Sequence, residues 1–114
     1  MRLDPATKAE ADRLGREIAK LARSGPLAPG SVTRRLTRCG RPGCRCGADP
    51  PRPHGTYWSW TRKVRNKTIT RYLSEEQYED YEQFFENARR LRSLLSDLEA
   101  LGLGIIEADS RWQR

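Results

Sequence analysis

The sequence contains little apolar material and few residues that can bind a metal or form cross-links. Hydrophobic residues make up 36% of its 114 residues and aromatic residues 8%, and there are three cysteines and one histidine. The mean hydropathy is -0.86. A chain this short and polar builds only a small core, so we expect a single domain, residues 1–114, in which something besides apolar burial stabilises the fold.

Long apolar runs and an even set of cysteines are also absent. Without a stretch of about 20 apolar residues we expect no membrane-spanning helix, and no apolar segment follows the N-terminus as it would in a signal peptide. An odd number of cysteines does not suit the disulfide framework of a small secreted protein. These absences predict a cytoplasmic protein with reduced thiols and no membrane partner.

All three cysteines and the only histidine lie close together in the sequence. Cys39, Cys44, Cys46 and His54 form the pattern C-x4-C-x-C-x7-H, which offers three thiolates and one imidazole to a single metal. Four ligands of these types make a closed tetrahedral zinc site. An iron–sulfur cluster fits less well because it is usually held by four thiolates. We therefore predict a structural Zn²⁺ ion bound by these four residues, with Cys44-x-Cys46 as the least typical spacing.

The sequence leaves two other roles open for these residues. A disulfide could join Cys39 to Cys44 or Cys46, although a reducing compartment disfavours it. Alternatively, His54 could activate Cys44 or Cys46 as a nucleophile, with nearby arginines lowering the pKa of the thiol. Three clustered cysteines suit metal ligation better than one nucleophile, and the basic segment has neither paired carboxylates nor a phosphate-binding glycine motif. We therefore expect no enzyme.

Acidic residues are nearly absent from the middle of the chain. Residues 31–73 carry eleven Lys and Arg against one Asp, whereas residues 74–114 carry five against ten acidic residues. Nine of the eleven are arginines, the residue type that binds phosphate with fixed geometry. Because the positive charge of the chain, +7 in total, is concentrated here, we predict a nucleic-acid partner for this segment.

The arrangement of apolar and turn-forming residues predicts an α+β fold in four segments. Residues 1–30 form a helix and a loop, since Asp4-Pro5 is a helix start and Ser24-Gly25-Pro26 a helix stop. Residues 31–73 form a small zinc-knuckle loop with a two- or three-stranded antiparallel β-sheet. Residues 74–104 form a long amphipathic helix that begins at a capping box and packs on the first helix, and residues 105–114 form a tail.

Residues 56–64 and 68–73 are rich in β-branched and aromatic residues and predict a hairpin. If Asn66-Lys67 is its two-residue turn, Arg62 lies directly opposite Arg71. Two like charges in register need a neutralising group, either a phosphate or the acidic residues of the following helix. The same alternation separates Trp58 and Trp60, for which we favour a core position, from the tyrosines on the opposite face.

The long helix carries more apolar residues than one partner helix needs. Six of them form a heptad seam: Tyr81, Phe84, Ala88, Leu91, Leu95 and Leu98. Since further apolar residues widen this stripe, the hairpin or another chain should cover the remainder. We therefore expect a homodimer or a larger protein partner that binds through residues 78–101.

The motifs of the central segment resemble a known family. The pattern runs from Cys39-Gly40 through Cys44-x-Cys46 to His54-Gly55-x-Tyr57, and then to Lys67-Thr68-x-x-Arg71 before a long helix. It resembles a family of short prokaryotic proteins classed as a domain of unknown function, over roughly residues 31–100. The resemblance implies the same layout of knuckle, hairpin and helix, and it suggests a link to mobile genetic elements without implying an activity.

Two functions follow from this sequence. The first is a non-catalytic, zinc-stabilised module that binds DNA or RNA, either by stacking unpaired bases on tyrosines or by placing a β-ribbon in a major groove. The second is a protein-interaction adaptor that acts through the long helix. The candidate nucleic-acid-binding residues are basic or aromatic: Arg34, Arg35, Arg38, Arg41, Arg45, Tyr57, Arg62, Lys63, Arg65, Lys67, Arg71 and Tyr72.

Overall fold

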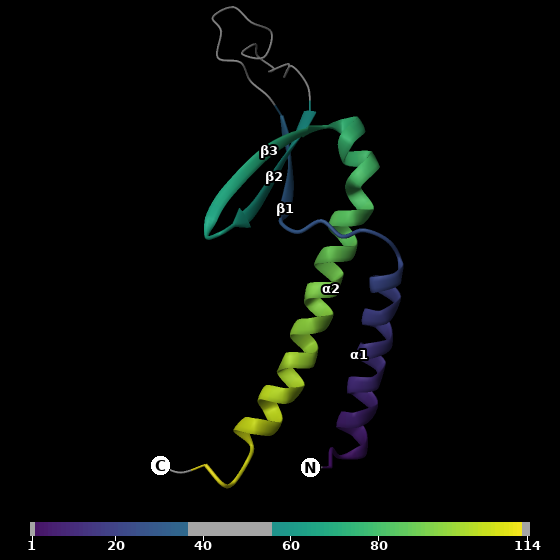
Figure 1. The fold of residues 1–114 in the computed structure, drawn as a ribbon, viewed down its shortest axis with the longest axis vertical. Helices are drawn as coiled ribbons and strands as arrows, with labels where there is room; N and C mark the ends of the chain where they lie inside the picture. Colours follow the sequence, from purple (N-terminus) through teal and green to yellow (C-terminus); the bar gives the residue numbers. More distant parts are fainter. Residues whose placement is uncertain (1, 37–55, 113–114) are drawn as a thin grey trace, which may run out of the picture. The chain divides into compact units, whose positions relative to one another are not determined.

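The computed structural model describes residues 2–36 and 56–112, which contain two helices and three strands (Figure 1). In chain order these are α1 (Pro5–Arg23), β1 (Ser31–Leu36), β2 (Thr56–Val64), β3 (Lys67–Ser74) and α2 (Glu75–Glu107). The chain divides into two compact units. The sheet unit is Ala28–Glu86, and the helical unit is Met1–Leu27 with Asn87–Arg114. The predicted α+β class is confirmed.

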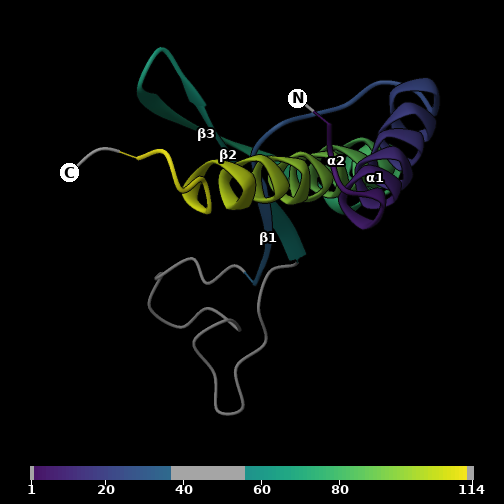
Figure 2. The same ribbon diagram turned by 90° about the horizontal axis from the view of Figure 1, so that it is seen from below.

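The strands of the sheet unit form one antiparallel sheet in the order β1-β2-β3, so that β2 lies in the middle. Its two ends are marked by the pairs Leu36↔Thr56 and Val64↔Lys67. Figures 1 and 2 show the β2–β3 turn and the Leu36/Thr56 end at opposite ends of the sheet. The hairpin strands predicted from composition agree with β2 and β3 to within one residue at each boundary.

The core of the sheet unit lies between the sheet and the first turns of α2. Trp58 stacks on Tyr78 with ring centroids 3.5 Å apart, and Trp60 lies 5.6 Å from Phe85. Leu73 and Phe85 are buried. Aromatic burial against a helix therefore holds the sheet, and the core position predicted for the two tryptophans is confirmed.

The segment before β1 closes one edge of this core. The indole Nε1 of Trp60 donates a hydrogen bond to the carbonyl oxygen of Pro29 at 2.8 Å. The next residue, Gly30, has a φ of +103°, and a Cβ atom there would lie 2.4 Å from the carbonyl oxygen of Thr61. Only glycine fits this position, because it tolerates positive φ and allows the backbone to approach β2 closely.

α1 begins and ends where its capping residues predict. The Asp4 carboxylate accepts a hydrogen bond from the backbone N–H of Thr7 at 2.8 Å, and Pro5 follows as the first helical residue. This hydrogen bond lowers the pKa of the Asp4 carboxyl group. At the other end Ser24 caps the helix, and Gly25 leaves it with a φ of +137°.

The helical unit is built around Leu14, whose exposed fraction is 1%. Ala88 and Leu94 of α2 are also buried. Between the helices, the Nδ2 atom of Asn87 donates a hydrogen bond to the Ser24 hydroxyl at 3.0 Å. The predicted packing of the long helix on the first helix is therefore confirmed.

α2 begins at Glu75 with the predicted capping box. The backbone N–H of Ser74 donates to Oε1 of Gln77 at 3.0 Å, and the backbone N–H of Gln77 donates to the Ser74 hydroxyl at 3.1 Å. These reciprocal bonds satisfy donors that a helix start otherwise leaves free. Neither described helix is long and apolar enough to cross a membrane.

The end of α2 differs from the prediction. The sequence predicts a stop near Gly102 and Gly104, but the helix continues to Glu107. Glycine inside a helix costs only about 1 kcal/mol, which the surrounding residues can offset. Beyond the glycines, the carbonyl oxygen of Ile106 accepts two hydrogen bonds, from the backbone N–H of Asp109 at 3.2 Å and from the indole Nε1 of Trp112 at 2.6 Å.

The predicted heptad seam of α2 is only partly buried. Tyr81 and Leu95 are each 42% exposed, whereas Phe85 and Leu94 outside the seam are buried. The reason is that α2 serves two units. Its first turns pack on the sheet through Phe85, and its later turns contribute Leu94 to the helical unit, so no single stripe runs along it.

Candidate nucleic-acid interface

Part of the predicted site lies outside the described residues. This applies to the four predicted metal ligands, Cys39, Cys44, Cys46 and His54, and to three of the basic residues, Arg38, Arg41 and Arg45. In residues 2–36 and 56–112 there is no group of three His, Cys, Asp or Glu side chains that could hold a metal ion. The structure therefore leaves the zinc prediction untested.

The hairpin turn lies one residue earlier than predicted. Its central residues are Arg65 and Asn66, with φ values of +52° and +67°. Positive φ at both positions is the signature of a type I′ turn, whose twist suits a two-residue hairpin. Val64 consequently pairs with Lys67, and every pair of the hairpin is displaced from the predicted register.

This register corrects the prediction that Arg62 faces Arg71. Arg62 lies opposite Ile69, and Arg71 lies opposite Trp60, so the two arginines are diagonal neighbours on one face. The physical reason is that like charges directly opposite each other destabilise a sheet, whereas a cation beside an aromatic ring is favourable. The guanidinium carbon of Arg62 lies 4.9 Å from the centroid of the Trp60 ring.

Alternation along the strands gives the sheet two different faces. We call the face toward α2 the covered face. By register it carries Val32, Arg34, Leu36, Trp58, Trp60, Arg62, Val64, Lys67, Ile69, Arg71 and Leu73. The other we call the open face, and it carries Ser31, Thr33, Arg35, Tyr57, Ser59, Thr61, Lys63, Thr68, Thr70, Tyr72 and Ser74.

The open face combines two tyrosines, two cations and seven hydroxyl side chains, and no carboxylate lies on it. Tyr57 and Tyr72 meet edge to face, with ring centroids 5.3 Å apart and an angle of 77° between the rings. Tyr72 is 67% exposed and Tyr57 is half-buried. A protruding aromatic pair on a sheet with no negative charge is suited to contact unpaired bases.

The register also orders these groups along the open face. Arg35 lies directly opposite Tyr57 near the Leu36/Thr56 end, whereas Lys63 pairs with Thr68 beside the turn. From Tyr57 to Lys63 is six residues of strand, or about 20 Å at roughly 3.4 Å per residue. The exposed cations Arg35 and Lys63 thus lie toward opposite ends of the open face, and the tyrosines lie beside Arg35. We call the row of groups between the two cations the track.

Hydroxyl groups fill the middle of this track, and they are not among the residues predicted from the sequence. The Thr61 and Thr70 hydroxyls lie 3.3 Å apart across the strand pair, whereas Ser59 is buried and is not available to a ligand. The signal was present in the alternation Thr68-Ile69-Thr70, which places threonines on one face. Hydroxyls both donate and accept hydrogen bonds, so they can contact bases or phosphates.

The basic residues of the covered face are differently placed. Arg34 Nε lies 3.3 Å from Oε1 of Glu75 on α2, and Arg62 packs on Trp60. Of the two possibilities raised for a neutralising group, helix acids do fold back, but Glu75 pairs with Arg34 and not with Arg62 or Arg71. Lys67 and Arg71 are exposed, and Lys67 directly follows the turn.

Two donors on the covered face are buried and have no hydrogen-bond partner among the described residues. They are the indole Nε1 of Trp58 and Nε of Arg62. Unpaired buried donors cost free energy. Their position beneath α2 and beside Trp60 fits structural side chains and not a binding surface, so the predicted set of basic and aromatic residues divides between the two faces.

Comparison with known protein families matches the sheet and parts of both helices. A family described as a domain of unknown function (DUF6788) matches residues 6–83. The matched range begins in α1, includes all three strands and ends in the first part of α2. No curated protein and no solved structure matches the chain.

Proposed function

The chain belongs to the DUF6788 family, a domain of unknown function, and from its open face we propose that it is a non-catalytic module that binds single-stranded nucleic acid. The observation that carries the proposal is the contact between half-buried Tyr57 and exposed Tyr72 on a sheet face that holds Arg35 and Lys63 and no acidic residue. Aromatic rings on exposed sheets bind unstacked bases in several nucleic-acid-binding folds.

Single strands suit this surface better than a duplex. The major groove is about 12 Å wide and admits a helix or a two-stranded ribbon. Three strands at about 4.8 Å spacing, covered on one face by α2, are wider than such a ribbon. A single strand instead exposes its bases to Tyr57 and Tyr72 while its phosphates contact Arg35 and Lys63.

A structural zinc ion is part of the proposal, with Cys39, Cys44, Cys46 and His54 as its ligands. Three thiolates and one imidazole are the donor types that zinc takes in closed sites. Support comes from the strand register, because Leu36 and Thr56 are paired and hold both ends of the intervening chain at neighbouring positions. When bound, the metal supplies cross-linking, and we assign it no chemistry beyond that.

The cellular compartment and the biological role that we propose for the module rest on its sequence. We place it in the cytoplasm, because three cysteines do not make the even disulfide set of a small secreted protein. The resemblance of the central motifs to proteins linked with mobile genetic elements supports an accessory role in a DNA-processing system of that kind.

Binding of oligonucleotides tests the proposal. Fluorescence anisotropy at low salt compares strands of about 12 nucleotides, DNA and RNA, with the corresponding duplex. We expect single strands to bind best, and Tyr57→Ala or Tyr72→Ala to weaken binding about 5- to 150-fold, equivalent to 1–3 kcal/mol per base. Tyr81→Ala is the matched control, since this tyrosine is also exposed but lies on α2. It should bind as the unmodified protein does.

Three results would overturn the proposal: no binding at low salt, preference for the duplex, or equal binding by the Tyr57, Tyr72 and Tyr81 variants. The metal is tested separately by elemental analysis of the purified protein and of Cys44→Ser. We expect about one zinc per chain, and loss of zinc with a lower melting temperature in the variant. Unchanged metal content and melting would exclude the assigned site.

A second candidate is an adaptor that self-associates or binds another protein through residues 78–101. It is supported by the exposure of Tyr81 and Leu95, both 42%, on a helix that is otherwise partly buried. Light scattering after size exclusion tests it. A dimer that Tyr81→Ala or Leu95→Ser converts to a monomer would support this candidate, and a monomer with no co-purifying protein would reject it.

A further inference from the structure

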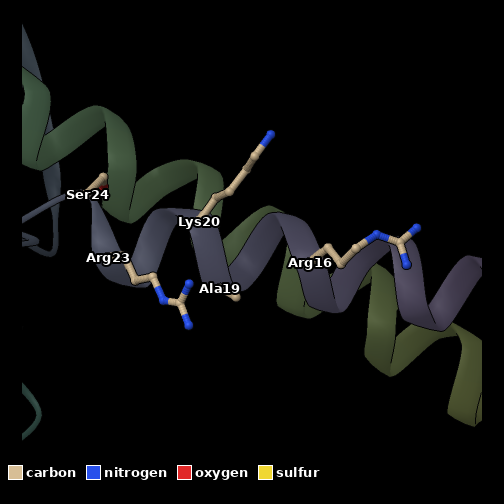
Figure 3. Close-up of a pocket in the computed structure, with 5 residues that line it drawn as sticks. All are labelled: Arg16, Ala19, Lys20, Arg23 and Ser24. Atoms are coloured by element: carbon tan, nitrogen blue, oxygen red, sulfur yellow. The ribbon is translucent and has the colours of Figure 1, made fainter.

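A row of cations on α1 belongs to neither function above. Arg16, Lys20 and Arg23 follow each other at intervals of four and three residues, which places them on one side of the helix. With Ala19 and Ser24 they line a shallow hollow of about 450 Å³. Figure 3 shows the three side chains extending away from the helix around the short side chain of Ala19.

The arginines of this row are not engaged elsewhere in the described part of the chain. Arg13, one turn earlier, is bound to Glu10 at 2.6 Å, and Lys20 lies 4.0 Å from Glu17. Among residues 2–36 and 56–112, Arg16 and Arg23 have neither an ion pair nor a side-chain hydrogen bond. Both are exposed. Their charges are therefore available to an external anion.

The arrangement suits an extended anion and not a compact one. In Figure 3 the Lys20 and Arg23 side chains diverge from each other, so the three charges do not converge on a point. Arg16 and Arg23 are seven residues apart, or about 10.5 Å along the helix. Along one strand of a duplex the phosphates advance about 3.4 Å each, and an unstacked single strand spaces them further apart, so this row spans more than one phosphate.

Neither the helix dipole nor a membrane surface accounts for the whole row. Cations in the last turn interact favourably with the dipole, which suits Lys20 and Arg23, but the effect fades within one turn and does not reach Arg16. A helix that lies on a membrane needs an exposed apolar face. The large apolar residues of α1 are instead covered, since Leu14 is only 1% exposed and Ile18 and Leu21 are half-buried.

The geometry points to a second nucleic-acid contact on α1, in which Arg16, Lys20 and Arg23 bind the phosphate backbone of the strand. The inference rests on the proposed function, since it takes the same ligand. It differs in chemistry, because this contact is electrostatic and independent of base sequence, whereas the open face contributes stacking. The helical unit is thereby assigned a role in binding.

The salt dependence of affinity tests this inference in the full-length protein. The variant carries Arg16→Gln, Lys20→Gln and Arg23→Gln, which keep helix-forming side chains in place. The control carries Lys8→Gln, Arg13→Gln and Arg92→Gln and loses the same charge. For a single strand, each phosphate contact contributes about 0.7 to the slope of log affinity against log salt. Because this slope is negative, loss of three contacts should make it less steep by about 2 in the variant. The slope of the control should stay nearly constant.

The Tyr57→Ala, Tyr72→Ala double variant keeps the two proposals separate. It should lose affinity with an unchanged salt slope, since stacking releases no counterions. If the tyrosine variant loses binding but the α1 variant has the slope of its control, the α1 contact is wrong and the proposed function stands. A third outcome would overturn both the proposed function and the α1 contact. In it the protein binds no nucleic acid but binds anionic lipid vesicles, and only the α1 variant loses the vesicle binding.

Discussion

The two faces of the sheet share the same three strands and have opposite surroundings. On the covered face Trp58 stacks on Tyr78 and Trp60 is held by Pro29, whereas on the open face Tyr72 is 67% exposed. Both faces carry aromatic and basic residues, so composition does not distinguish them. What differs is that rings of α2 cover the tryptophans, whereas Tyr57 and Tyr72 contact only each other, and that difference assigns stability to one face and binding to the other.

Of all the substitutions considered, removal of the Trp60 ring from the covered face should destabilise the fold most. Trp60→Ala deletes the contact with Phe85 and leaves the Pro29 carbonyl without its donor. We expect the free energy of unfolding in urea to fall by about 3 kcal/mol, as for other core aromatics. A loss below about 1 kcal/mol would show that the covered face is not the core of the sheet unit.

Gly30→Ala tests the packing at the edge of the covered face, where the backbone of residue 30 approaches β2. The added methyl would lie 2.4 Å from Thr61 O and 2.9 Å from Trp60 Nε1, at a φ of +103°. We expect a loss of about 2 kcal/mol in urea unfolding from overpacking and backbone strain. Gly15→Ala is the control, because nothing lies within 4 Å of a Cβ there. It should stabilise α1 by up to about 1 kcal/mol, and equal effects would contradict the described packing.

Tyr72→Ala measures how much a ring of the open face contributes to the stability of the fold. The ring contacts Tyr57 but is largely exposed, so its removal should lower the free energy of unfolding by less than about 1 kcal/mol. Tyr72→Phe keeps the ring and should unfold as the unmodified protein does. If Tyr72→Ala destabilised the fold as much as Trp60→Ala, the open face would be a second core.

The smallest effect is expected at the ion pair between the sheet and α2. The side chains of Arg34 and Glu75 are 63% and 43% exposed, and exposed pairs contribute at most about 1 kcal/mol. Arg34→Gln should lower the free energy of unfolding by about 0.5 kcal/mol at low salt. The difference should vanish at about 1 M salt, where charges are screened within about 3 Å. A salt-independent loss would point to packing of the arginine stem.

Local signals in the sequence predicted much of the fold. Asp4 and Ser74 mark helix starts, and both make the capping bonds that their side chains allow. The alternation in β2 separated the tryptophans from the tyrosines. These predictions hold because each depends on neighbours within a few residues.

Predictions that depend on distant partners were less accurate. The turn at Arg65-Asn66 contains no glycine, and its position follows from the pairing of β2 with β3 over the whole hairpin. α2 runs past Gly104 to Glu107, and hydrogen bonds from Asp109 and Trp112 to the carbonyl of Ile106 lie at its end. In the sequence, the cation row on α1 is indistinguishable from a solvated surface, since only the structure places Arg16 and Arg23 away from acidic partners. The spacing of residues along a helix does not show which cations have acidic partners in the folded chain.

The pairing of Leu36 with Thr56 has a consequence for how the family can vary. Two strands whose ends already meet need only a short connection, and lengthening a connection costs little additional entropy. The sheet therefore places few geometric demands on the number of residues between these strands. Relatives should tolerate insertions, deletions or a plain hairpin turn at this point while keeping both faces of the sheet intact.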